Sequence, residues 1–132
     1  MFKHILFSAL LSLTATFAAF ADPITDVIAD QIDAFADRDP DRAFSHASPM
    51  IQSQFGSPAR FATMVEQGYP SLWSNKTKLF TERLEQGPQA RQIVIVTGTN
   101  GARAAFAYDM IRIGEGWKIN GVRPMPLSDE SV

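Results

Sequence analysis

The segment that most restricts the fold of this chain runs from Ala102 to Arg123, near the C-terminal end of the sequence. β-Branched and aromatic residues lead up to Gly114-Glu115-Gly116 and resume directly after it. Such a pattern is typical of two strands that fold back on each other through a short turn. We therefore predict a long antiparallel β-hairpin in this part of the chain.

Apolar burial favours one register for this hairpin. If Ile113 faces Trp117, then Ile111 faces Ile119, and the four side chains share one face of the hairpin. A shift of one residue would mix apolar and polar side chains on both faces. We therefore expect this apolar face to be the one that is buried.

Two more strands are predicted before the hairpin. Residues 78–85 alternate between apolar and polar side chains, whereas the strand predicted over 92–97 holds four apolar residues, 93–96, on both faces, as a central strand would. A turn rich in Gly and Asn, residues 97–101, connects the second strand to the hairpin. The four strands would form an antiparallel meander.

The first half of the chain carries four helix-start signals of the same kind. Each is an Asp or Ser followed by a proline, and the pairs are Asp22-Pro23, Asp39-Pro40, Ser48-Pro49 and Ser57-Pro58. The side chain can cap a free backbone N–H, and proline has none to leave unpaired at the first helical position. We predict a first, amphipathic helix over 23–36, shorter helices after the next two signals, and a fourth helix closed by Gly68 in a left-handed cap.

This order of elements predicts an α+β fold. N-terminal helices would pack on one face of a curved, four-stranded antiparallel sheet. Residues 22–126 are enough for one domain with a single core, and residues 127–132 are predicted to be a flexible tail.

Residues 1–21 have the pattern of a signal peptide. Lys3 supplies a basic start, residues 5–20 are mainly apolar, and Ala19-Phe20-Ala21 fits a cleavage motif. The apolar run is just short of the roughly 20 residues that a spanning helix needs. We therefore expect cleavage near Ala21 and a mature protein that is periplasmic or secreted and not embedded in the membrane.

Composition excludes several classes of function. The predicted mature chain has 11 basic and 14 acidic side chains without a basic cluster, which argues against nucleic acid as a partner. The chain has no cysteine, and His46 is the only histidine after residue 21, so we predict no metal site. No phosphate-binding glycine loop or dinucleotide motif occurs, and we predict no cofactor.

Several segments resemble a known bacterial exported family, domain of unknown function 4864. They are QIDAFADRD (31–39), AFSHASP (43–49), Phe55-Gly56, FATMVEQGYP (61–70) and GWKINGV (116–122). More widely, the order of elements resembles the cone-shaped, cystatin-like roll of the nuclear transport factor two (NTF2) and SnoaL-like superfamily. That resemblance implies a cavity between the concave sheet face and the helices. The chain departs from it where residues 43–55 are predicted to be helical, since many members have a short hairpin there.

Three hypotheses about function remain open. The first is a binding module for a small apolar ligand or a protein, with a cavity lined by Phe55, Tyr69, Trp73 and Tyr108.

The second hypothesis is an enzyme of isomerase, cyclase or hydratase type. Asp109 would lie on the isoleucine face opposite Gly121 and act as general base, with His46 as partner and Tyr69 or Tyr108 as hydrogen-bond donor. The structural alternative for Asp109 is a strand residue at a bulge that pairs with Arg112 or a loop amide.

The third hypothesis is a homodimeric scaffold. Its interface would be the second face of the hairpin, which carries Met110, Arg112, Lys118 and Asn120.

Overall fold

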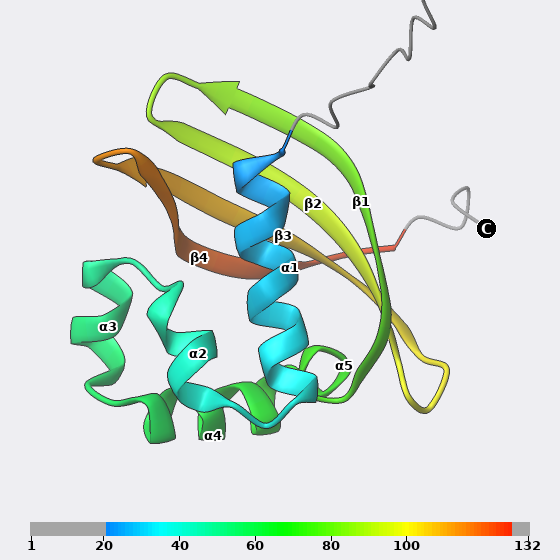
Figure 1. The fold of residues 1–132 in the computed structure, drawn as a ribbon. Helices are drawn as coiled ribbons and strands as arrows, with labels where there is room; N and C mark the ends of the chain where they lie inside the picture. Colours follow the sequence, from blue (N-terminus) through cyan, green and yellow to red (C-terminus); the bar gives the residue numbers. More distant parts are fainter. Residues whose placement is uncertain (1–20, 128–132) are drawn as a thin grey trace, which may run out of the picture.

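The computed structural model describes residues 21–127, which form five helices followed by four strands (Figure 1). The helices are α1 (Pro23–Ala36), α2 (Pro40–Ser45), α3 (Pro49–Phe55), α4 (Pro58–Gly68) and α5 (Pro70–Trp73). The strands are β1 (Asn75–Gln86), β2 (Gln89–Gly98), β3 (Arg103–Ile113) and β4 (Gly116–Met125). The predicted signal peptide and the tail after Leu127 lie outside the described residues.

All four predicted helix starts are confirmed. The side chains of Asp22, Asp39, Ser48 and Ser57 each accept a hydrogen bond from a backbone N–H in the first turn of the following helix. The predicted left-handed cap at Gly68 is wrong, because Gly68 is the last residue of α4 and its φ is not positive. The left-handed cap belongs instead to Gly56 (φ 82°), which ends α3.

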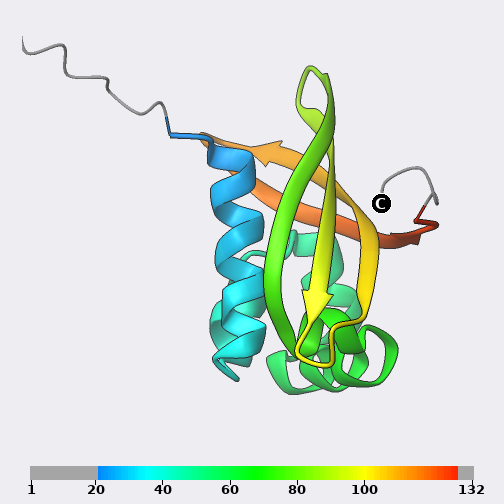
Figure 2. The same ribbon diagram turned by 90° about the vertical axis from the view of Figure 1, so that its right-hand side faces the viewer.

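The four strands form one antiparallel sheet in the order β1-β2-β3-β4. The sheet is curved, α1 lies across it, and the shorter helices gather near one end (Figure 1). Seen from the side, the described helices lie on the same side of the sheet, and the other face is left open (Figure 2). This is the predicted α+β arrangement, and we call the open side the outer face.

The core fills the space between α1 and the sheet. Ile28 and Ile32 of α1 are fully buried, as are Val94 and Val96 of β2. Each such side chain contributes roughly 1.5–3 kcal/mol by leaving water. The amphipathic stripe predicted for 23–36 is therefore the surface that joins helix and sheet.

The predicted register of the β3–β4 hairpin is wrong at its turn. Ile113 pairs with Gly116 rather than Trp117, so the loop has two residues and begins with Gly114 at φ 63°. Two-residue loops with positive φ match the twist of the strands better than the three-residue loop we expected. A bulge between Asp109 and Met110 then restores the predicted pairing of Asp109 with Gly121.

The altered register changes which hairpin side chains are buried. Met110, expected on the second face, is 2% exposed and packs in the core with Ile119. Ile113, expected in the core, is 44% exposed. The large side chains of Tyr108 and Met110 face the helices, and Asp109 therefore belongs to the outer face.

Among residues 21–127, no helix is long and apolar enough to cross a membrane.

Candidate functional site

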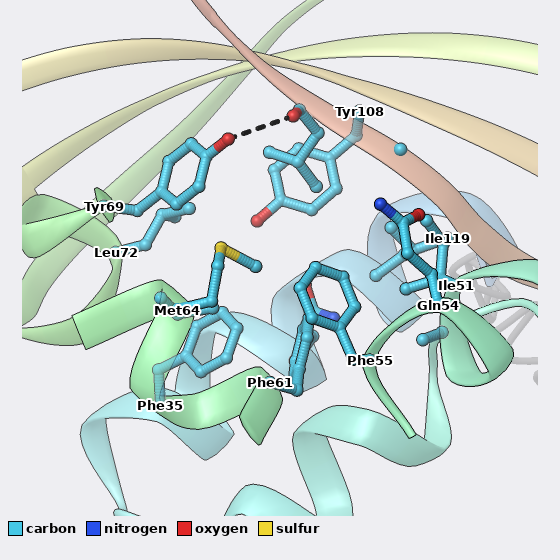
Figure 3. A pocket seen from close by; sticks show the side chains of 15 residues that line it. Phe35, Ile51, Gln54, Phe55, Phe61, Met64, Tyr69, Leu72, Tyr108 and Ile119 are labelled. Carbon is cyan, nitrogen blue, oxygen red and sulfur yellow. Dashed lines mark hydrogen bonds between the residues drawn. The ribbon is translucent and has the colours of Figure 1, made fainter. Parts of the chain in front are cut away.

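A cavity of about 250 Å³ lies between the sheet and the helices. Its wall is mainly aliphatic and aromatic, and Figure 3 shows the side chains around the space. The lining residues are Gln31, Phe35, Ala47, Ile51, Gln54, Phe55, Phe61, Met64, Val65, Tyr69, Leu72, Tyr108, Ile119, Gly121 and Val122. None of these residues is an acid, a histidine, a lysine or an arginine.

The aromatic side of the cavity is a continuous packed cluster. The ring of Phe61 lies 5.5 Å from Phe44, 5.6 Å from Phe55 and 6.0 Å from Phe35, between centroids. These distances are in the range in which tilted and edge-to-face aromatic pairs attract each other. The cluster ties α1, α2, α3 and α4 together and gives the cavity a firm apolar wall.

Helix α3 closes the side of the cavity that reaches solvent. It contributes Ile51, Phe55 and the exposed Gln54, but none of its own residues is fully buried. Its start is held to β4, because the buried Ser48 donates through Oγ to Asn120 Oδ1 at 2.8 Å and through its N–H to the Ile119 carbonyl at 2.8 Å.

Tyr108 supplies the most unusual group in the cavity wall. The residue is fully buried, and its hydroxyl has no hydrogen-bond partner among the described residues. Figure 3 shows this hydroxyl directed toward the space between Met64 and Phe61. Burial, with a smaller contribution from nearby Tyr69, raises the pKa of Tyr108 well above its usual range, so the group stays protonated.

Three other polar side chains reach the cavity. Tyr69 donates a long hydrogen bond of 3.5 Å to the Val122 carbonyl (dashed in Figure 3), and Gln31 donates through Nε2 to the Ala43 carbonyl at 3.2 Å. Gln31 is only 1% exposed, and Gln54 lies at the open side. The polar groups are therefore neutral amides and phenols.

Our sequence analysis missed Gln31 and Gln54. Gln31 could have been found, since it lies four residues from both Val27 and Phe35 and helical spacing puts it inside the apolar stripe of α1. No comparable signal identifies Gln54, because α3 is short and largely exposed.

The predicted ligand-binding residues do not all meet in one place. Phe55, Tyr69 and Tyr108 line the cavity. Trp73 does not line it: the guanidinium of Arg38 lies 4.2 Å from the centre of its ring, and Phe35 packs nearby at 6.4 Å. Trp73 instead helps to close the end of the core.

Asp109 lies outside this cavity, on the outer face. Its carboxylate contacts Arg91 at 2.9 Å and Arg123 at 3.4 Å, and with Arg91 it borders a separate hollow of about 210 Å³. Asp109 is thus an ion-paired strand residue next to a bulge, as the structural alternative predicted. Its partners are Arg91 and Arg123 rather than the predicted Arg112. The predicted position of a base inside the cavity is wrong.

His46 also lies away from the cavity and far along the chain from Asp109. It ends α2, and its Nε2 lies 2.5 Å from Asp30 Oδ2. Arg42 binds the same carboxylate at 2.7 Å. Hydrogen bonds from Arg42 and then His46 lower the pKa of Asp30 to about 2. This cluster joins α1 to α2, and it does not bring His46 together with Asp109.

Within the described part of the chain, no three His, Cys, Asp or Glu side chains are placed so that they could hold a metal ion.

Solved structures with a similar fold include two proteins of the NTF2-like class. One, from Campylobacter jejuni, is described as an NTF2-like transpeptidase; it is 12% identical, with a TM-score of 0.59 over 75% of this chain and 98% of that one. The other, an NTF2-like protein of unknown function from Shewanella oneidensis MR-1, is 15% identical, with a TM-score of 0.55 over 78% and 96%. At these identities the likeness shows the fold alone, and it confirms the predicted NTF2-like roll.

No curated protein matches the chain. The model of the family called domain of unknown function (DUF4864), however, matches residues 18–132, which is nearly all of the sequence after its first segment. The chain therefore belongs to the DUF4864 family and has an NTF2-like fold.

Proposed function

We propose that this protein binds a small, mainly apolar molecule in the cavity between sheet and helices. The observation that carries this proposal is an apolar, aromatic cavity whose wall includes a buried hydroxyl without a partner, that of Tyr108. A buried polar group without a partner is costly, and native proteins seldom keep one without a reason. A bound molecule would supply the missing partner.

The size of the cavity limits the molecule. Its volume of about 250 Å³ exceeds the roughly 150 Å³ of a cavity that accepts benzene. It is below the roughly 300–1,000 Å³ of sites for drug-sized ligands. A single substituted ring or a short branched aliphatic molecule fits this range.

The lining favours binding over catalysis. General acid–base catalysis near neutral pH needs a group such as a carboxylate or imidazole that can exchange a proton there. The cavity wall has none, and its two phenols are neutral donors or acceptors. The hypothesis of an isomerase, cyclase or hydratase with Asp109 as base therefore has no support from the geometry of the cavity.

The binding proposal can be tested by NMR with ethylbenzene as the probe. Addition of ethylbenzene to ¹⁵N-labelled protein is expected to shift amide signals of β3, β4 and α4 around the cavity. In Ile51→Trp the larger side chain fills the open side of the cavity, and the shifts should be lost. Met50→Trp is the matched control, because Met50 is on the same helix, is 56% exposed and does not line the cavity. Shifts that are unchanged in Ile51→Trp, or absent in the wild type with both ethylbenzene and benzyl alcohol, contradict the proposal.

The outer face favours a second candidate function, the homodimer. Leu79, Ile95, Ala105 and Met125 pair across all four strands on this face, and the two end residues are 59% and 40% exposed. A row of apolar side chains on an open sheet suits pairing with the same row of a second copy. This face replaces the one expected from sequence, since Met110 is buried and Asn120 bonds Ser48.

Light scattering checks the dimer. The wild type should have twice the mass of one chain at about 100 μM, a concentration at which weak homodimers form, and Leu79→Lys should halve that mass. Gln67→Lys serves as a control, because it adds the same charge at an exposed position of α4, away from the row. A wild type that stays monomeric rules this candidate out.

Export is also part of the proposal, since residues 1–21 have the composition of a signal peptide. Mass spectrometry of the protein from the periplasm of a bacterial host should give a chain that begins at Asp22. A chain that retains Met1 in the cytoplasm would refute export.

A further inference from the structure

We infer that the molecule held in the cavity is uncharged and carries one hydroxyl group, as an alcohol or phenol does, which Tyr108 and Tyr69 bind together. This inference rests on the proposed function and adds the chemical class of the ligand. It follows from which polar groups the cavity offers, which of their hydrogen bonds are already made, and which charges are missing.

Tyr108 offers a hydrogen bond that no described residue accepts. Its residue is 0% exposed, and its Oη has no partner within hydrogen-bond distance. The proton stays on this oxygen because the ionised form would be buried without a counter-charge. A ligand atom that meets this hydroxyl must therefore be able to accept a hydrogen bond.

Tyr69 offers the complementary group, a hydrogen-bond acceptor. Its only proton points to the Val122 carbonyl, at 3.5 Å, which leaves the oxygen lone pairs free to accept. Figure 3 shows the ring of Tyr69, which comes from the junction of α4 and α5, beside the ring of Tyr108 on β3. The two phenols also lie close enough for Tyr69 to affect the ionisation of Tyr108. A ligand hydroxyl can accept from Tyr108 and donate to Tyr69, whereas an ether or ketone can only accept.

The cavity has no charge to balance a charged ligand. None of the fifteen lining residues is Lys, Arg, His, Asp or Glu. An unpaired carboxylate or ammonium group would lose its hydration without compensation, which costs far more than moving a neutral hydroxyl. Fatty acids, aromatic acids and amines are therefore poor ligands for this site.

The rest of the ligand faces apolar surface. Phe35, Phe61, Met64 and Leu72 surround the space below the two phenols, as Figure 3 shows. These side chains can make only apolar contacts, so a second polar group would be left without a partner. One hydroxyl on a compact hydrocarbon body satisfies the two phenols and this apolar part of the wall, while Gln31 is already bonded to the Ala43 carbonyl and Gln54 lies at the open side.

The test uses three probes of similar size: benzyl alcohol, ethylbenzene and benzoate. Ethylbenzene has a methyl group where benzyl alcohol has its hydroxyl, so the pair isolates the hydrogen bond. Calorimetric titrations measure both neutral compounds against the wild type, Tyr108→Phe and Tyr69→Phe. The quantity compared is the ratio of the two affinities within each protein, because this ratio cancels differences in how the protein packs.

We expect the affinity for benzyl alcohol, relative to ethylbenzene, to fall about tenfold in Tyr108→Phe, as for the loss of one buried hydrogen bond. In Tyr69→Phe the fall should be smaller, about threefold, since the long bond to Val122 shows a less confined hydroxyl. Benzoate should bind at least about tenfold more weakly than benzyl alcohol to the wild type. Circular dichroism checks that each variant is folded.

The outcomes separate the two proposals. If ethylbenzene binds, Ile51→Trp abolishes that binding and the affinity ratio is unchanged in Tyr108→Phe, the inference is wrong and the binding function stands. Tighter binding of benzoate than of benzyl alcohol also overturns the inference alone. If neither neutral probe binds in the cavity, both proposals fail.

Discussion

Replacement of Tyr108 by phenylalanine should stabilise the ligand-free protein. Loss of a hydroxyl from a buried tyrosine usually weakens a fold, because most such hydroxyls make a hydrogen bond. Here the residue is 0% exposed and its hydroxyl has no partner among the described residues. Tyr108→Phe keeps the ring and its packing and removes only the unpaired polar group.

The expected gain follows from the cost of burying that group. An unsatisfied buried hydroxyl costs about 1–3 kcal/mol relative to its hydrated state in the unfolded chain. Since the hydroxyl faces a cavity with an open side, water that enters transiently can relieve part of this cost, and we expect the lower end of the range, about 1 kcal/mol. For a domain of this size the melting temperature would rise by about 4 °C.

Urea unfolding at pH 7, followed by circular dichroism, measures the change. The slope of unfolding free energy against urea should stay the same, so that the midpoint alone reports stability. Tyr69→Phe is the matched control, because that hydroxyl does donate a hydrogen bond, to the Val122 carbonyl. Its loss should lower stability by about 0.5 kcal/mol.

A fall in stability of about 1 kcal/mol or more in Tyr108→Phe would refute the reasoning. It would mean that the hydroxyl is satisfied in the free protein, by a fixed water in the cavity. The proposed ligand would then have to displace that water, and the hydroxyl would no longer favour binding.

Three further predictions concern pH and the helix ends. Because the pKa of Tyr108 is raised above its unfolded value of 10.0, the unfolded chain loses this proton first as pH rises. The unfolding free energy therefore keeps its full value below pH 10 and should fall above it. In urea titrations this fall should be larger in the wild type than in Tyr108→Phe, by up to about 1.4 kcal/mol per pH unit. Asp30 has its pKa lowered to about 2 from 3.8, so its contribution is present above pH 3.8 and is lost as pH falls toward 2. After allowance for its exposed position, Asp30→Asn should cost about 0.5–1 kcal/mol at pH 6 and only a small fraction of that at pH 2, and an equal cost at both would contradict the ion pair with Arg42. Arg38 has φ 55° and holds the carbonyls of Phe35 and Trp73, so Arg38→Ala should lose about 2 kcal/mol, while Arg38→Gly should lose about 1 kcal/mol less because glycine tolerates this φ. Equal losses in the two variants would show that the backbone is not strained.

The helices could be predicted from sequence because each begins with a local signal. Asp22, Asp39, Ser48 and Ser57 cap a helix within three residues of themselves, and this chemistry needs no distant partner. The fifth helix, α5, was missed because it lacks a complete signal of this kind. It starts with Pro70, but Tyr69 before it makes no side-chain cap, so the signal is incomplete.

The sheet was predicted less well, because long-range packing decides which side of a strand is buried. The order of strands followed from turn residues and alternation, but the side of β3 that is buried depended on a two-residue turn and a bulge beside Asp109. Both Ile111 and Met110 are apolar, so composition alone could not choose between the two faces. Helix packing against Tyr108 and Met110 made that choice.

The candidate site was also predicted only in part. Phe55, Tyr69 and Tyr108 line the cavity because bulky residues near the helix–sheet junction tend to face it. The position of Asp109 inside the cavity was wrong because the buried face of β3 was misassigned, and Asp109 and His46 each pair instead with an arginine or aspartate on their own surface.

The walls of the cavity are anchored unequally, and this affects how fast a bound molecule can leave. β3, β4 and α4 hold buried side chains and are fixed by the core, whereas α3 buries none and is attached through Ser48 to β4, through Gln52 to the carbonyls of Phe44 and Ala47, and through Phe55 to Phe61. A segment with few buried contacts opens at a much lower free energy than the whole domain. Local opening of α3 would let a bound molecule leave without unfolding of the domain, so how long the molecule stays depends on this helix. Variants at the ends of this helix should therefore change dissociation rates while leaving equilibrium constants nearly untouched.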